Sequence, residues 1–127
     1  AYENSARAVA GEVTDPYLAG LIAGTSGIAT YLVGDVTQAL ALLGEGEKHL
    51  RQVPGASWEL DSIKLFTLFV MRCIGDFAAV RRRYDRYAVE AEQCGDLYLA
   101  STMRRAWSWT CRSGPSRPAT ASRTRSW

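Results

Sequence analysis

The sequence has few residues of the kinds that build metal centres and disulfide frameworks. Its 127 residues include one histidine, His49, and three cysteines, Cys73, Cys94 and Cys111. The cysteines do not have the spacing of metal ligands, and an odd number of them argues against a disulfide framework. The first residues also do not show the basic and then apolar pattern of a secretion signal. We therefore predict no metal site, and we expect a reducing compartment, the cytoplasm.

Acidic residues are missing from residues 112–127, which are rich in arginine, serine and proline. Such a composition cannot bury a core. We assign residues 111–127 to a disordered basic tail, and residues 1–110 to a folded part. The tail is equally typical of GC-rich DNA read out of frame, and composition alone does not separate the two readings.

Charged residues are also missing from Tyr17 to Gly34, which is long enough to cross a membrane. Gly20 and Gly24 in this stretch have the spacing found between membrane helices. However, glycines and hydroxyl residues keep the mean hydropathy of the stretch low. Small residues at helical spacing also allow soluble helices to approach closely, so we predict a buried helix and no membrane span.

The alternation of polar and apolar residues that marks strands is absent too, and apolar residues recur with helical spacing almost throughout. Gly34-Asp35 and Gly75-Asp76 each follow a long apolar segment, 41 residues apart. Glycine accepts the left-handed conformation that closes a helix, and aspartate caps the next helix. The spacing therefore predicts an all-α fold of antiparallel helix pairs, stacked as a solenoid of about five to six helices.

Several local features follow from this pattern. We expect Asp15 and Ser57 to be helix N-caps. Gly44 and Gly46 should each weaken their helix by about 1 kcal/mol relative to alanine. Glu47 should pair with Arg51 on the solvent side. The predicted helices span residues 16–33, 36–52, 58–74, 77–94 and 97–109, with residues 2–13 as the end of a preceding helix.

The turns and their surroundings resemble tetratricopeptide-type repeats, because Gly27 and Ala39 are small where the helices of a pair would cross. More specifically, Ala56 to Arg104 is similar to the helical-repeat region of bacterial serine/threonine kinases fused to an ATPase module. The features that carry this likeness are Trp58-Glu59-Leu60, Gly75-Asp76, Arg81-Arg82-Arg83 and Gly95-Asp96-Leu97-Tyr98. The resemblance implies a regulatory or protein-interaction scaffold within a longer signalling protein.

Catalytic chemistry is not expected in this chain. The stretch Gly44-Glu45-Gly46-Glu47-Lys48 does not match a phosphate-binding loop, because the pattern breaks at His49. Carboxylates two residues apart, such as Glu90 and Glu92, point to different faces of a helix and cannot share a substrate. We therefore predict no catalytic residue and no cofactor, and regard the chain as not an enzyme.

The resemblance also implies a concave groove that takes a protein, a peptide or a neighbouring domain of the parent chain. Core packing is the alternative for Leu65 and Phe69, since their helix is apolar on every side. The residues that the pattern places on the groove are Leu21, Tyr31, Ser62, Leu65, Phe69 and Arg72.

A basic face is the sharpest charge feature of the sequence. It consists of Arg81, Arg82, Arg83 and Arg86, which could meet phosphates or an acidic partner. The alternative is a solvated surface with pairs Arg82–Asp85 and Arg86–Glu90. Two further readings stay open: a basic nucleic-acid-binding helical module, which we favour less, and a truncated fragment without a function in isolation.

Overall fold

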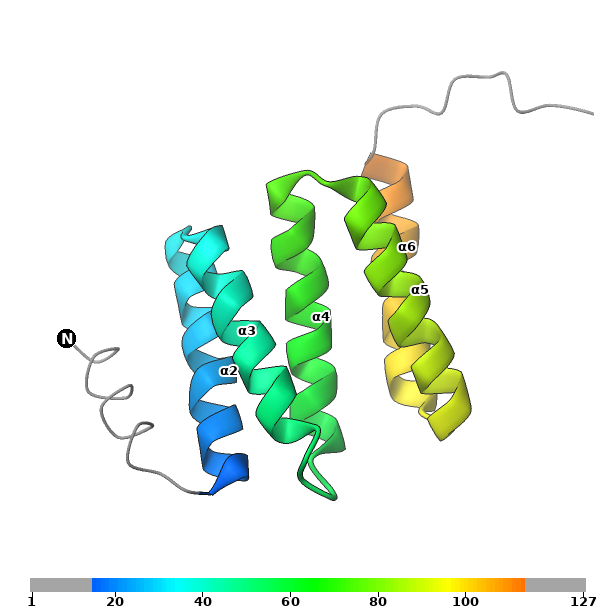
Figure 1. The fold of residues 1–127 in the computed structure, drawn as a ribbon. Helices are drawn as coiled ribbons and strands as arrows, with labels where there is room; N and C mark the ends of the chain where they lie inside the picture. The colour runs from blue at the N-terminus through cyan, green and yellow to red at the C-terminus, as the bar shows by residue number, and fades with distance from the viewer. Residues whose placement is uncertain (1–14, 114–127) are drawn as a thin grey trace, which may run out of the picture.

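The structure is a computed structural model that describes residues 15–113, and within this range it contains five α-helices and no strand (Figure 1). The predicted all-α fold is therefore confirmed. The expected helical turns at 2–13 and the tail residues 114–127 lie outside the described residues. The helices are α2 (Pro16–Val33), α3 (Val36–Leu50), α4 (Ser57–Ile74), α5 (Phe77–Cys94) and α6 (Leu97–Ser113).

The turns between paired helices have the predicted glycine–aspartate chemistry. Gly34 ends α2 with a φ of 103°, and the carboxylate of Asp35 accepts a hydrogen bond of 3.1 Å from the Gln38 N–H. Gly75 ends α4 in the same left-handed conformation, with a φ of 89°. Glycine has no side chain to clash there, so the chain can reverse within two residues. Asp76 and Asp96 cap α5 and α6 in the same way.

Three predicted boundaries were wrong. Helix α3 ends at Leu50, two residues before its predicted end at residue 52. Ser57 is the first residue of α4, and Ala56 is at the N-cap position, which has no side-chain hydrogen bond. Helix α6 continues to Ser113, beyond the predicted end at Trp109. The first glycine and proline after Trp109 are at positions 114 and 115, so nothing in the sequence breaks the helix earlier. The first three residues assigned to the tail are therefore helical.

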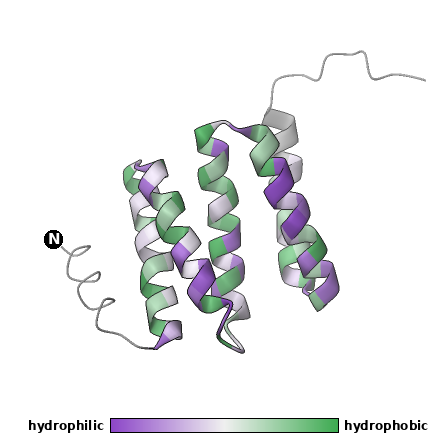
Figure 2. Cartoon of the chain, viewed as in Figure 1, coloured by the Kyte–Doolittle hydropathy of each residue, from purple (hydrophilic) through white to green (hydrophobic). Residues whose placement is uncertain are grey.

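Successive helices run in opposite directions and lie side by side from α2 to α6, so α2, α4 and α6 point the same way (Figure 1). Helix α4 is central and contributes Ile63 and Val70 to one buried cluster, and Leu68 to another. Figure 2 shows the difference between the mostly hydrophobic α4 and the hydrophilic outer side of α5. Packing on two sides explains why α4 is apolar around most of its circumference.

The contact between α2 and α3 depends on small residues. A Cβ atom added to Gly46 of α3 would lie 2.8 Å from the backbone nitrogen of Gly24 in α2. By length and composition α2 is the one described helix that passes as a membrane span, with a mean hydropathy of 1.2. Its buried residues are Gly20, Gly24, Gly27 and Thr30. Only 22% of α2 is buried, so the prediction of a buried helix holds only for the face that these glycines form against its neighbours.

Candidate interaction surfaces

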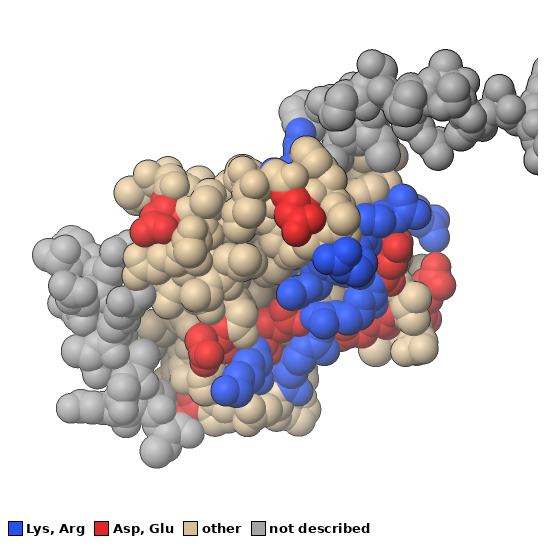
Figure 3. Space-filling model, turned by 45° about the horizontal axis from the view of Figure 1, so that its top comes forward, with Lys and Arg blue, Asp and Glu red and all other residues tan. Residues whose placement is uncertain are grey.

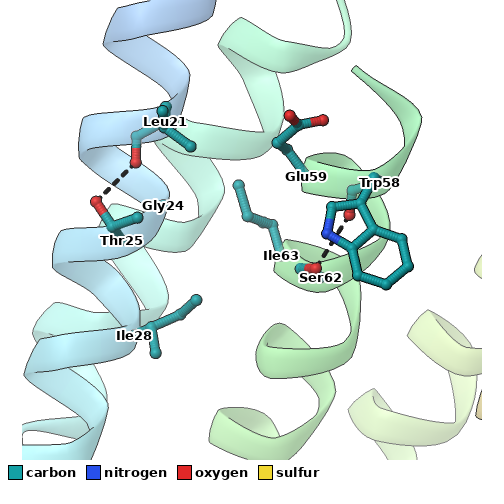
Figure 4. A pocket seen from close by; sticks show the side chains of 8 residues that line it. All are labelled: Leu21, Gly24, Thr25, Ile28, Trp58, Glu59, Ser62 and Ile63. Carbon is teal, nitrogen blue, oxygen red and sulfur yellow. Dashed lines mark hydrogen bonds between the residues drawn. The ribbon is translucent and has the colours of Figure 1, made fainter. Parts of the chain in front are cut away.

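The residues predicted to line a groove lie on α2 and α4, and two of them line a cleft between these helices. The cleft has a volume of about 200 Å³ and includes Leu21 and Ser62. Leu21 and Ile28 of α2 face Ile63 of α4 across it (Figure 4). Most of the exposed lining is apolar, with polar groups from Thr25, Glu59 and Ser62, so the cleft suits an apolar side chain. Its other lining residues are Gly24, Thr25, Trp58 and Glu59.

A second hollow brings together three more of the predicted residues with α6. Tyr31, Phe69 and Arg72 line an open space of about 510 Å³ together with Arg105 and Ala106. Phe69 is 38% exposed and is therefore part of this surface. Leu65 is the exception, because it is half-buried and packs against the core cluster around Leu68.

The structure adds an aromatic pair that the sequence pattern did not indicate. The rings of Trp58 in α4 and Tyr98 in α6 are 5.0 Å apart. Trp58 is 63% exposed and Tyr98 is 48% exposed. Nearby, the hydroxyl of Tyr17 donates a hydrogen bond of 2.9 Å to Glu59. Both aromatic residues stand in the motifs that carry the family likeness, but only the packing of α6 beside α4 shows that they meet.

The four arginines of the predicted basic face do not act as one group. Arg81 pairs with Asp85 at 3.2 Å and lies over the ring of Trp107. The predicted pair Arg82–Asp85 is therefore replaced by Arg81–Asp85, since residues four apart lie closer to one line along the helix. Arg82, Arg83 and Arg86 instead line a separate cleft with Met71 and Ala79.

Glu47 is the centre of a buried charged cluster, which corrects its predicted place on the solvent side. Its side chain joins Arg51 at 2.7 Å as predicted, but Glu47 is only 6% exposed. The hydroxyl of the fully buried Tyr87 donates a hydrogen bond of 2.7 Å to its other oxygen. Helix α5 covers this side of α3, and Tyr87 supplies the partner that a buried carboxylate requires.

Glu90 extends the cluster to a third helix. It pairs with Arg51, the C-cap residue of α3, at 2.8 Å and with Lys64 of α4 at 3.0 Å, in place of the predicted pair with Arg86. Hydrogen bonds from Arg51 and then Lys64 lower the pKa of Glu90 to about 2, against the opposing effect of burial. Burial and the hydrogen bond to Glu47 raise the pKa of Tyr87 to about 12. The cluster therefore ties α3, α4 and α5 together, and in it Glu90 stays ionised and Tyr87 stays neutral near neutral pH.

Asp61 is a buried carboxyl whose pKa is raised, in contrast to the lowered pKa of Glu90. It is 4% exposed in α4, and burial, followed by its hydrogen bond to Asp96 and the charge of that residue, raises its pKa to about 7. Lys64 opposes this shift. Because Asp96 also caps α6 by accepting a hydrogen bond from Leu99, the two carboxyls join α4 to the start of α6.

This arrangement predicts a stability maximum on the acidic side of neutral pH. The folded chain binds a proton at Asp61 that the unfolded chain has lost, so stability falls as pH rises from 3.8 to about 7. Glu90 acts in the other direction, since its contribution is lost as pH falls from 4.5 towards about 2. We expect the highest urea midpoint near pH 4, between the unfolded-state pKa values of the two carboxyls, 3.8 and 4.5. At pH 8, Asp61→Asn should stabilise the chain by about 1 kcal/mol.

The matched control is Asp85→Asn, which changes an exposed carboxylate. The wild-type chain should be less stable at pH 8 than at pH 5, and in Asp61→Asn most of this difference should disappear. If the wild-type chain and Asp61→Asn differ equally at both pH values, Asp61 does not hold the proton.

The remaining candidates for chemistry do not form a site. Within residues 15–113, no group of three or more His, Cys, Asp or Glu residues is arranged to hold a metal ion. His49 lies 3.9 Å from Glu45 on the surface, and Cys73 and Cys94 are exposed free thiols. Comparison of the chain with protein-family models, curated proteins and solved structures finds no match.

Proposed function

We propose that this chain is a non-catalytic interaction scaffold built as a short tetratricopeptide-like α-solenoid. Three observations support this arrangement: antiparallel succession of the helices, repeated glycine–aspartate turns, and glycines at the crossing of α2 and α3. In this proposal α2, α4 and α6 form the partner-binding face, with its two hollows. The partner is a protein segment or a neighbouring domain of a longer chain.

The exposed aromatic residues of the partner-binding face carry the proposal. Trp58, Phe69 and Tyr98 together expose a large aromatic surface beside an apolar cleft and two arginines, Arg72 and Arg105. Large aromatic and arginine side chains are the residues that dominate binding energy at protein interfaces. A partner would place an apolar side chain between α2 and α4, and polar groups towards the arginines.

The family resemblance suggests where such a scaffold works. A chain similar to the repeat region of bacterial serine/threonine kinases fused to an ATPase module would be a regulatory segment in the cytoplasm. It would transmit binding at the partner-binding face to catalytic segments elsewhere in the parent protein. Nothing in this proposal requires a catalytic residue or cofactor in the chain itself.

The test is a selection of displayed random peptides on the purified full chain, after a cooperative thermal melt has shown that it folds. Peptides selected on the wild-type chain should lose at least about tenfold in affinity for Trp58→Ala and for Phe69→Ala. The control is Val89→Ala, which truncates an exposed apolar residue on α5. Affinities are measured by titration calorimetry, with the melting midpoint of each variant as a check on folding.

Two outcomes would count against the scaffold. Selected peptides that bind Trp58→Ala and Phe69→Ala as tightly as the wild type would place the binding surface elsewhere. A chain that aggregates or melts without cooperativity would support the alternative of a fragment that has no function in isolation.

A further inference from the structure

A second surface lies on the side of the molecule where α5 meets α3, away from the partner-binding face. Its cleft has a volume of about 300 Å³ and is lined by Met71, Ala79, Arg82, Arg83 and Arg86. Arg83 and Arg86 both come within 3.9 Å of Glu47 on α3, which places the cleft on that side. Figure 3 shows the basic side chains as a band across this part of the surface, with acidic side chains along it.

Two of the three guanidinium groups are held in place by a buried ring. Arg83 donates a hydrogen bond of 3.2 Å to the hydroxyl of Tyr87. The guanidinium carbons of Arg83 and Arg86 lie 5.8 Å and 5.5 Å from the centre of the Tyr87 ring, within the range of cation–π attraction. Tyr87 is fully buried and bonded to Glu47, so it cannot move freely. A ligand would therefore meet guanidinium groups that are already ordered, which lowers the entropic cost of binding.

The carboxylates near the cleft do not neutralise all of its positive charge. The oxygens of Glu47 already have hydrogen bonds of 2.7 Å from Arg51 and Tyr87. The distances of 3.9 Å to Arg83 and Arg86 are longer than a charge-assisted hydrogen bond. Of the three arginines of the cleft, Arg83 and Arg86 share this one carboxylate, which Arg51 also neutralises, so a phosphate dianion at the cleft would meet net positive charge.

We propose that Arg82, Arg83 and Arg86 bind a phosphate monoester, presented as a phosphoserine or phosphothreonine by a protein partner. Guanidinium groups match phosphate oxygens in pairs, and a phosphate monoester carries a charge of about −1.5 to −2 at neutral pH. Nucleic acid fits less well, since it needs cations in a row along successive phosphates. Here three arginines converge on one cleft, and Arg81 is turned towards Asp85 and Trp107.

The test uses the full chain and two short peptides that differ only by phosphorylation of a central serine. Binding is followed in ¹H–¹⁵N spectra that include the arginine side-chain signals. The phosphopeptide should shift the signals of Arg82 and Arg86, and bind more weakly at pH 5.5, where the phosphate loses part of its charge. Arg82→Ala should weaken binding about tenfold. Arg86→Lys keeps the charge but removes the fork, so it should also weaken binding.

Arg104→Ala is the matched control, because it removes an exposed arginine of α6 that does not line this cleft. The proposal is overturned if the unphosphorylated peptide binds equally, or if Arg104→Ala weakens binding as much as Arg82→Ala. Equal affinity for inorganic phosphate would overturn the assignment to a protein partner. Tighter binding of a fifteen-nucleotide oligothymidylate, with a steep dependence on salt, would favour the nucleic-acid module instead. The outcome does not depend on the partner-binding face, since the two surfaces share no residue.

Discussion

Replacing Gly46 with alanine is expected to destabilise the chain by about 2–3 kcal/mol, as in other overpacked cores. The added Cβ atom would lie 2.8 Å from the nitrogen and 3.0 Å from the Cα atom of Gly24. Both atoms belong to the backbone, so α2 and α3 would have to separate. Gly44, two residues earlier in the same helix, has nothing within 4 Å of its added Cβ. Gly44→Ala should therefore stabilise the chain by up to about 1 kcal/mol through helix propensity.

Urea denaturation of the two variants and the wild type measures this difference directly. Gly24→Ala is an informative third variant, because its Cβ would meet the end of the Ile63 side chain at 2.5 Å. That side chain can turn away, so we expect a smaller loss than for Gly46→Ala. If Gly44→Ala and Gly46→Ala change stability by the same amount and in the same direction, α2 and α3 do not approach each other closely at Gly46.

Replacing Glu47 with alanine should cost about 3 kcal/mol of stability. The variant would leave Arg51, Arg83 and Arg86 without the carboxylate that they approach, and the buried Tyr87 hydroxyl without its acceptor. Buried groups that lose a charged partner pay their full cost of desolvation. The control is Glu45→Ala, which removes an exposed glutamate from the same helix and should change stability by less than about 0.5 kcal/mol.

A double-mutant cycle with Tyr87→Phe separates the hydrogen bond from the rest of the cluster. Tyr87→Phe alone should cost about 1–2 kcal/mol, because it removes the donor but keeps the ring. The double variant Glu47→Ala/Tyr87→Phe should lose less stability than the two single variants lose together, since both changes remove the same hydrogen bond. Strict additivity would show that the hydroxyl and the carboxylate do not interact in solution.

The turns of this fold could be predicted from sequence because their chemistry is local. Gly34 and Asp35 act on backbone groups within five residues of themselves, and Gly75 and Asp76 act over similarly short distances. The order of the helices and most of their ends follow from such signals together with the apolar period. The prediction failed at Ser57 and at the end of α6, where the local signal was weak or absent.

The two glycines of α3 show a limit of prediction from local sequence signals. Gly44 and Gly46 are two residues apart and therefore lie on different faces of the helix. The sequence shows two glycines in one helix, but it does not show that only Gly46 meets α2. The same limit applies to Glu47, whose burial depends on Tyr87, 40 residues later in the chain.

Part of the partner-binding face was predicted from the sequence, and part of it is seen only in the tertiary structure. The family resemblance selected six residues of α2 and α4, and all of them except Leu65 line its hollows. The resemblance did not select Tyr98 or Arg105, since the placement of α6 beside α4 decides whether they join this surface.

The sequence by itself determined the helical fold, its turns and the pairing of neighbouring helices, because each depends on short-range backbone chemistry and on the apolar period. The tertiary structure decided which polar residues are buried, which of the two glycines of α3 has no room for a side chain, and which arginines share a cleft. These properties depend on contacts between helices that are remote in sequence, and burial by a neighbouring helix changes the energy of a charge more than any feature of its own helix does.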